Sequence, residues 1–211
     1  MQYNSAEEYL RKVLSFTVNE KTASEEAEKI TKVFPSGASL ASADANVLVN
    51  LSDCNEKTAD FIRLLSALGS RRITDGFKPG KKYTREEIER YICALLFHLS
   101  VESVYMITFD KSGKLISADL ITEGTVNSSA FLPRKMADLV LRKRASSVIL
   151  AHNHPSGNIS PSVSDCVTTG NLVSFFSKIG IEVVEHYVVA GNEYVGIKRM
   201  EEMARLAGTQ R

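Results

Sequence analysis

The sequence has no tryptophan, only three cysteines and five prolines, and no apolar run as long as a membrane span. Three scattered cysteines (Cys54, Cys93 and Cys166) are too few for a disulfide framework and lack the C-x-x-C spacing of a zinc knuckle. The first residues, MQYNSAEEYLRKV, lack the apolar stretch and cleavage site of a secretory signal. These absences predict a protein of the reducing cytoplasm that does not enter a membrane.

An excess of charge of one sign is also missing, because 26 Lys and Arg residues stand against 25 Asp and Glu residues. A net charge of +1 gives no bulk electrostatic attraction to nucleic acid. One local basic excess lies in residues 71–85. Its basic side chains are Arg71, Arg72, Lys78, Lys81, Lys82 and Arg85. They form a candidate contact for nucleic acid, and a solvated basic linker is the alternative.

What is present suits a folded chain, since 44% of the 211 residues are hydrophobic and 24% are charged. Residues 1–99 have the pattern of helices. Capping-box pairs that predict helix starts are Ser5 with Glu8, Thr22 with Glu25, and Thr84 with Glu87. Further short helices are expected over residues 40–51 and 58–68.

The pattern changes to strands near residue 100. Residues 104–122 predict a hairpin whose turn uses Gly113, and further strands are expected over 146–152, 181–190 and 193–197. Helices are expected from Pro133, from Ser162 and at the end of the chain. The segment DGFKPGKK, with two glycines and a proline, predicts a linker. We therefore expect an α+β fold with a helical domain over 1–75, a linker over 76–83 and a second domain over 84–211.

Two histidines at the end of a predicted buried strand are the first sign of chemistry. His152 and His154 are two residues apart, so on a strand both imidazoles project from one face. Pro155, Gly157 and Pro161 then predict a tight loop. H-x-H beside two prolines is less readily explained by packing than a lone histidine is. His98 and His186 lack such neighbours and are expected to be ordinary helix-end and strand residues.

The loop leads to Ser162, which is expected to open a helix, and to Asp165 in its first turn. This placement can fold the carboxylate onto His152 and His154, giving two nitrogen ligands and one oxygen ligand. Three protein ligands with one open position are typical of catalytic zinc. By itself S-x-x-D is a helix-capping pattern, but its combination with H-x-H favours a metal site.

The motif H-x-H followed by seven residues and S-x-x-D resembles the JAMM (MPN+) metalloproteases. The stretches VESVYMITFD, EGTVNSSAFLPRKM, ILAHNHPSGNISPS and EHYVVAG further resemble the RadC family, labelled DNA repair proteins. The resemblance covers about residues 95–200. It implies a JAMM-like mixed sheet flanked by helices, with zinc held by His152, His154 and Asp165 at a strand–loop–helix junction.

The resemblance also implies a glutamate that acts as general base. Its position at the start of a strand favours Glu102, and Glu123 is the competitor. Ser162 is then expected to stabilise the oxyanion. RadC proteins carry a helix-hairpin-helix-like region with a Gly-x-Gly turn that can hold DNA phosphate. The matching residues 51–62 here contain no glycine, so this domain is expected to be a degenerate version.

Together these features predict a zinc-dependent hydrolase that cleaves an amide, peptide or isopeptide bond of a peptide or protein substrate. Two alternatives stay open. The chain could be a DNA-associated accessory protein with a structural or vestigial metal site, or an interaction module. Retention of all three expected ligands favours the enzyme over the module.

Overall fold

The computed structural model describes residues 5–43, 45–124 and 131–208 of the chain. The chain forms two compact units, residues 1–72 and residues 73–211. The expected domain limits at residues 75 and 84 stay a prediction. Within the expected linker, the Gly80 amide donates a hydrogen bond to the main-chain oxygen of Leu115 at 2.8 Å. The Leu115 amide donates to the main-chain oxygen of Lys81, also at 2.8 Å. This part of the segment is therefore tied to the second unit.

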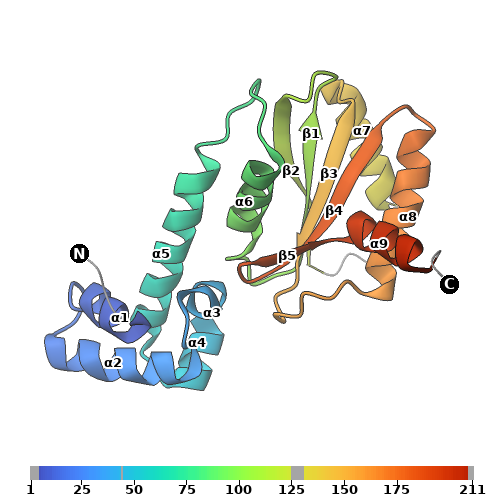
Figure 1. The fold of residues 1–211 in the computed structure, drawn as a ribbon. Coiled ribbons are helices and arrows are strands. Elements are labelled where there is room, and N and C mark those ends of the chain that lie inside the picture. Colours follow the sequence, from blue (N-terminus) through green and yellow to red (C-terminus); the bar gives the residue numbers. More distant parts are fainter. Residues whose placement is uncertain (1–4, 44, 125–130, 209–211) are drawn as a thin grey trace. The chain divides into compact units, whose positions relative to one another are not determined.

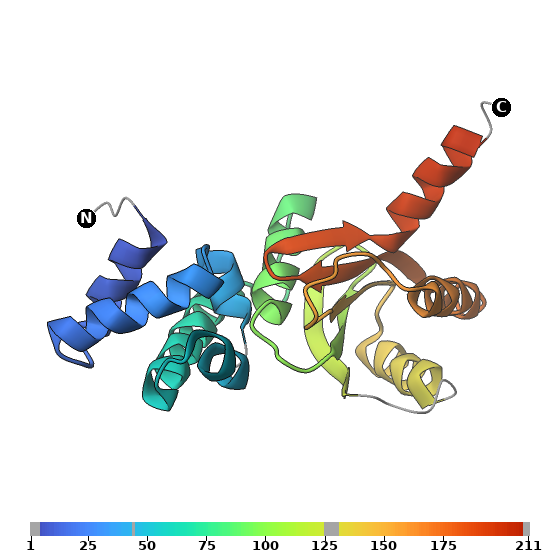
Figure 2. The same cartoon turned by 90° about the horizontal axis from the view of Figure 1, so that it is seen from below.

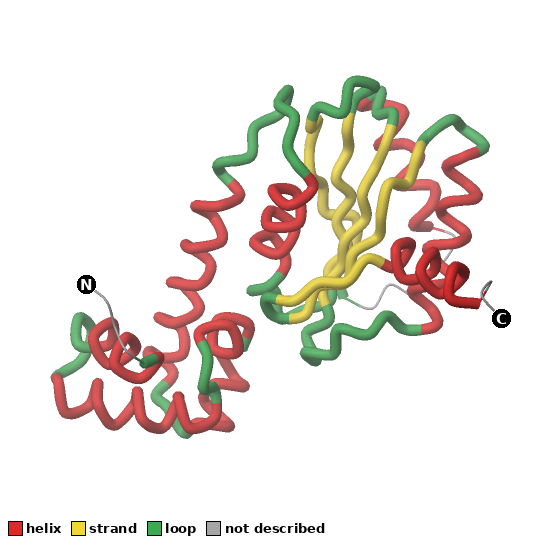
Figure 3. Tube along the Cα trace, viewed as in Figure 1, coloured by secondary structure: helices red, strands yellow, loops and turns green. Residues whose placement is uncertain are grey.

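The first unit consists of helices in the part of the chain that the structure describes (Figure 3). They are α1 (Ala6–Leu14), α2 (Glu20–Val33), α3 (Gly37–Ser42), α4 (Ala45–Ser52) and α5 (Glu56–Thr74). Apolar side chains from these helices form one core, which includes the fully buried Leu14, Ile30 and Leu48. Burial of these side chains, at roughly 1.5–3 kcal/mol each, holds the short helices together.

Two of the expected features of this unit are corrected by the structure. Thr22 does not begin a helix, because Asn19 caps α2 and accepts a 2.9 Å hydrogen bond from the Thr22 amide. Asparagine is a better N-cap than threonine, so the helix begins three residues earlier than expected. The helix expected over residues 40–51 is two helices, because Ala43 has an extended backbone (ψ 135°) that ends α3.

The second unit is built on a five-stranded mixed sheet (Figure 1). Its strands are β1 (Ser103–Phe109), β2 (Leu115–Glu123), β3 (Ser147–Asn153), β4 (Glu182–Ala190) and β5 (Glu193–Gly196). Their order is β2-β1-β3-β4-β5, and only β3 and β4 pair in parallel. Its helices are α6 (Arg85–Leu96), α7 (Phe131–Lys143), α8 (Val163–Ser177) and α9 (Ile197–Gly208). The expected α+β fold is confirmed.

Helices cover both faces of this sheet, with α6 on one face and α7 and α8 on the other (Figure 2). Alternate residues of β3 enter different cores: Ile149 packs with the α6 core and Leu150 with the core under α7 and α8. The period of two places His152 on the same face as Leu150. His152 therefore faces the helix that carries Asp165.

The hairpin and cap predictions for this unit agree with the structure. Gly113 has φ +75°, a conformation that suits glycine in the turn between β1 and β2. Thr84 and Glu87 form the expected capping box of α6. No described helix is both long enough and apolar enough to span a membrane. Cys54, Cys93 and Cys166 all remain as thiols.

Candidate metal centre

The candidate centre is formed by the end of β3, the following loop and the start of α8. His152 is the penultimate residue of β3, and His154 follows the strand, where its amide still donates to Val189 of β4 at 2.8 Å. Gly157 has φ +82°, so the loop turns where glycine is tolerated best. The chain then enters α8, which carries Asp165 in its first turn.

His152, His154 and Asp165 form the one group of possible metal ligands among the described residues, and their ligand atoms lie within 4.8 Å of one another. The two Nε2 atoms of the histidines are 3.0 Å apart. Asp165 places Oδ1 3.5 Å from Nε2 of His152 and Oδ2 3.6 Å from Nε2 of His154. The structure thus brings together the three residues that the H-x-H and S-x-x-D motifs indicate as ligands.

A fixed hydrogen bond shows that His154 offers a lone pair to this group. Its Nδ1 lies 2.7 Å from the main-chain oxygen of Asn158, which can only accept. Nδ1 therefore carries a hydrogen, which leaves Nε2 as the nitrogen that can bind a metal ion. A hydrogen or a metal cation between Nε2 and the neighbouring nitrogen and carboxylate makes these close contacts favourable. The donor set of two imidazoles and one carboxylate fits zinc, which takes a fourth ligand in catalytic sites of this kind.

Asp165 is held as an anion by the residue that caps its helix. The Ser162 amide and hydroxyl both donate to Oδ2, at 2.7 and 2.6 Å, and the Asp165 amide donates back to Ser162 Oγ at 3.1 Å. Burial opposes ionisation, but these hydrogen bonds outweigh it, so the pKa of Asp165 lies below its ordinary value. The helix-cap interpretation of S-x-x-D is therefore correct, and it coexists with convergence on the histidines.

His152 is the most deeply buried of the three candidate ligands, with 2% of its side chain exposed. Burial disfavours its charged form and lowers its pKa to about 4, although the Asp165 carboxylate acts in the opposite direction. The ring is therefore neutral at pH 7, which is the state that binds a metal ion.

His186 was expected to be an ordinary strand residue, and this is only half correct. It lies on β4, but its Nε2 is 2.9 Å from Nδ1 of His152. On its other side, Nδ1 lies 2.6 Å from the hydroxyl of Thr169 on α8. No local motif in the sequence marks this role, because His186 reaches His152 through the parallel register of β3 and β4, in which Leu150 is the partner of His186.

The two candidate bases lie at the same end of the β1–β2 hairpin as the histidines. Glu102 directly precedes β1, and its main-chain oxygen accepts from Gly124 at 2.8 Å. Glu123 ends β2, opposite Ser103. Both side chains are exposed, and Val104 of β1 pairs with His152. Their assignment stays a prediction.

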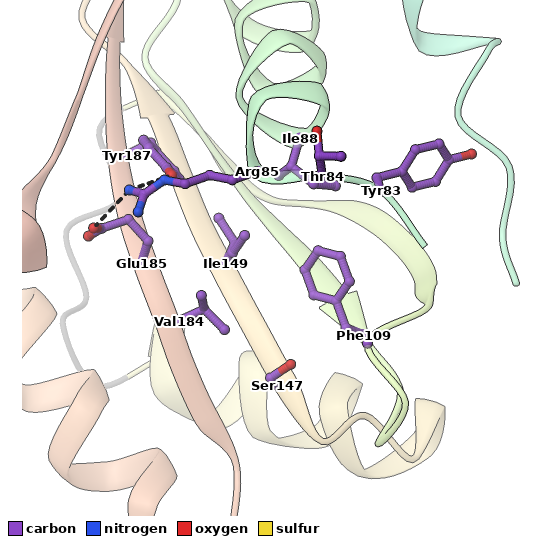
Figure 4. Close-up of a pocket in the computed structure, with 11 residues that line it drawn as sticks. Tyr83, Thr84, Arg85, Ile88, Phe109, Ser147, Ile149, Val184, Glu185 and Tyr187 are labelled. Carbon is purple, nitrogen blue, oxygen red and sulfur yellow. Dashed lines mark hydrogen bonds and ion pairs between the residues drawn. The ribbon is translucent and has the colours of Figure 1, made fainter. Parts of the chain in front are cut away.

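A cleft of about 300 Å³ lies on the other face of the sheet, beneath α6 (Figure 4). Arg85 crosses it, with a 2.8 Å ion pair to Glu89 and a 3.3 Å hydrogen bond to Tyr187. Its guanidinium also lies 4.0 Å from Glu185. Ile149, which lines the cleft, faces away from His152 along β3. The cleft is therefore separate from the candidate metal centre, and Arg85 is already paired within the chain.

The loop expected to correspond to a Gly-x-Gly turn uses two of its amides within the chain. The Asn55 amide donates to the Glu26 carboxylate at 3.0 Å, and the Lys57 amide donates to the Asn55 side chain at 2.8 Å. Asp53 in the same loop forms a 3.2 Å ion pair with Lys29. Carboxylates at this turn disfavour the approach of a phosphate.

This α+β unit thus carries a candidate metal centre, formed by two histidines and an aspartate, at a strand–loop–helix junction. A family model described as the RadC-like JAB domain matches residues 83–203, and the chain belongs to the RadC family. Residues 125–130, part of one stretch that resembles this family, lie outside the described residues.

Relatives from several bacteria share this similarity, and each is called a UPF0758 protein. One from Finegoldia magna is 33% identical over an aligned region that covers 63% of this chain and 58% of the relative. One from Fusobacterium nucleatum is 27% identical and covers 89% of this chain and 84% of its own length. One from Actinobacillus pleuropneumoniae serotype 5b is 31% identical, with 80% and 77% covered. These names state no activity.

Proposed function

We propose that this protein is a zinc-dependent hydrolase that cleaves an amide bond, in a peptide or as an isopeptide. The observation that carries the proposal is the convergence of His152, His154 and Asp165 within 4.8 Å. A RadC-like JAB domain over residues 83–203 supports it. Zinc with three protein ligands lowers the pKa of a water in the fourth position and polarises a carbonyl.

The protein's own residues supply the remaining steps. Glu102 accepts the proton of the attacking water and passes it to the leaving amine, which is the task of a general base and acid. Its place directly before β1, whose Val104 pairs with His152, supports this role. Glu123 is the alternative base. Burial of His152 excludes bulk water from one side of the centre.

Ser162 donates a hydrogen bond to the oxyanion of the tetrahedral intermediate. Its hydroxyl donates to Asp165 in the present structure, and this bond must be released for that role. Release is feasible because the Ser162 amide still donates to the same carboxylate oxygen at 2.7 Å. An oxyanion donor of this kind contributes about 2.7–4 kcal/mol to catalysis.

A role as a DNA-associated accessory protein has weaker support. Six basic residues are its strongest feature, but Arg85 is paired with Glu89 and crosses a cleft within the second unit. The amide of Asn55, at the turn expected to be a degenerate version of a phosphate-binding one, donates to Glu26. A separate part of the proposal is that the protein lies in the reducing cytoplasm, because its three cysteines all remain as thiols.

The test is a comparison of zinc-loaded wild type with zinc-loaded Glu102→Gln on a peptide library and on ubiquitin-type isopeptide conjugates. New amino termini in the peptides, and unmodified lysines with free carboxyl termini in the isopeptide conjugates, should form with the wild type and disappear after chelation; mass spectrometry detects both. Hydrolysis that persists without metal, or no hydrolysis of either substrate class, would contradict the proposal.

A further inference from the structure

We propose that Thr169 and His186 are positioning residues that hold His152 in the tautomer whose Nε2 carries no hydrogen and faces the metal centre. This inference rests on the proposed metal site, and it adds two residues that act through His152. Both are buried, with exposed fractions of 1% for Thr169 and 5% for His186.

The chain of hydrogen bonds begins at an atom that can only accept. The Thr169 hydroxyl lies 2.6 Å from the main-chain oxygen of Asp165, one helical turn earlier. A hydroxyl has a single hydrogen, so this bond uses the only one that Thr169 can donate.

The second contact is thereby fixed in direction. Thr169 Oγ1 also lies 2.6 Å from Nδ1 of His186, and with its hydrogen already used it must accept there. His186 therefore carries its hydrogen on Nδ1. In a neutral imidazole the other nitrogen then carries none, so Nε2 of His186 is an acceptor.

The third contact transmits this choice to the candidate ligand. His186 Nε2 lies 2.9 Å from Nδ1 of His152, and an acceptor on one side requires a donor on the other. His152 thus carries its hydrogen on Nδ1. Its Nε2 presents a lone pair to the space shared with Nε2 of His154 and Oδ1 of Asp165.

The first and last members of this series of hydrogen bonds belong to the same candidate centre. Asp165 supplies the first acceptor with its main chain and a candidate ligand with its side chain, and His152 is the last member. The contacts also connect α8 to β4 and β4 to β3, which are three successive elements of the chain. Metal-binding histidines generally need such a partner on the second nitrogen, and its loss weakens metal affinity 10–100-fold.

A purely structural role for Thr169 is the competing explanation, since it is a buried polar residue with two partners. The two explanations differ on the position of one hydrogen. Imidazole nitrogens with and without hydrogen have different ¹⁵N chemical shifts, and the chain has only four histidines to assign. The measurement uses metal-free protein, so it does not depend on hydrolysis.

The experiment records long-range ¹H–¹⁵N spectra of the metal-free full chain and then measures zinc affinity by competition with a chelator. Wild type should show His152 with hydrogen on Nδ1 only. Thr169→Val should give a mixture of His152 tautomers and bind zinc 10–100-fold more weakly. Thr169→Ser, which keeps the hydroxyl, should restore the wild-type tautomer and affinity to within about threefold. Thr168→Val, the exposed neighbour on α8, is the matched control and should change neither.

Hydrogen on Nε2 of His152 in the wild type would overturn the inference without any variant, so it stays testable even where Thr169→Val fails to fold. Equal loss of zinc affinity in the Val and Ser variants would also overturn it, because packing rather than the hydroxyl would then matter. Failure of hydrolysis alone, with the expected tautomer and zinc affinity, would contradict only the proposed function.

Discussion

Nε2 of His186 lies 2.9 Å from Nδ1 of His152, although the two residues are 34 positions apart in the sequence. Parallel pairing of β3 with β4 creates this contact, and α8 forms the crossover between the two strands. A candidate ligand on one strand is thus oriented by a residue of the next. The candidate metal centre therefore depends on the packing of β3, β4 and α8, as well as on its loop.

Zinc content tests the three-ligand centre directly. Wild type should bind about one zinc per chain, and Asp165→Ala and His154→Ala should lose most of it, because two protein ligands hold the ion poorly. Equilibrium dialysis followed by elemental analysis measures the stoichiometry. Asp138→Ala, which removes an exposed carboxylate paired with Arg142, is the control and should keep full zinc. Full zinc in both ligand variants would rule out the centre.

The helix cap and the proposed catalytic role of Ser162 can be separated. Ser162→Ala should lower the free energy of unfolding by about 1 kcal/mol through loss of the cap, and hydrolysis by roughly 10²-fold through loss of the oxyanion donor. Thr84→Ala removes the corresponding cap of α6 in the same unit. It should cost similar stability and leave hydrolysis unchanged. Equal activity in the two variants would leave Ser162 with the cap alone.

The buried carboxylate of Glu89 should give a pH-dependent contribution to stability. Burial raises its pKa, but hydrogen bonds from Arg85, Tyr187 and Tyr194 outweigh this effect and hold the pKa below 4.5. Its contribution is thus fully present above pH 4.5 and is lost as the pH falls through the lower folded-state pKa. Glu89→Gln should therefore be less stable by about 1–3 kcal/mol at pH 7, with a smaller difference below pH 4.

Urea unfolding of wild type and Glu89→Gln across pH 3–7 measures this difference. Glu182→Gln removes an exposed carboxylate of the same unit and should follow the wild type at every pH. If the free energy of unfolding of Glu89→Gln stays below that of the wild type by a constant amount down to pH 3, packing and not ionisation accounts for the difference.

The fold and the centre were predictable from sequence to different extents. His152 and His154 are close in the chain, and Asp165 follows within one loop and one helical turn, so local periodicity and spacing bring them together. The hairpin turn at Gly113 and the cap at Thr84 are local in the same way. Each depends on residues within a few positions, which a single sequence reveals.

Features that depend on pairing between distant segments were missed. His186 reaches the centre through the register of two parallel strands, and Thr169 reaches it through the packing of α8 on β4. Neither register nor helix rotation is marked by a local motif. The cap of α2 was missed for a different reason, because Asn19 competes with Thr22 for the same helix start and the capping-box pattern favoured the weaker cap.

Nucleic-acid binding is expected to be weak and strongly dependent on salt. Contacts from the six basic residues, Arg71, Arg72, Lys78, Lys81, Lys82 and Arg85, release counterions, so affinity should fall steeply as salt rises. Fluorescence anisotropy with labelled single- and double-stranded DNA at 50 and 200 mM salt measures this. Neutralising Lys78, Lys81 and Lys82 should reduce the salt slope. Tight binding at 200 mM salt that survives loss of all six charges would place the contact elsewhere.

The general base is the assignment that one pair of variants decides. Glu102→Gln keeps the size and hydrogen-bonding reach of the side chain but cannot accept a proton. It should retain zinc and lose roughly 10²-fold or more in hydrolysis. Glu123→Gln, at the end of the paired strand β2, is the matched control and should hydrolyse the substrate at close to the wild-type rate.

Metal content and initial rates on the same preparations separate the outcomes. Loss of zinc in Glu102→Gln would make Glu102 a ligand instead of a base. An active Glu102 variant with an inactive Glu123 variant would transfer the role to Glu123 and leave the metal site unchanged. Normal hydrolysis by both variants would mean that neither carboxylate accepts the proton, and the water-activation mechanism would then be wrong for this protein.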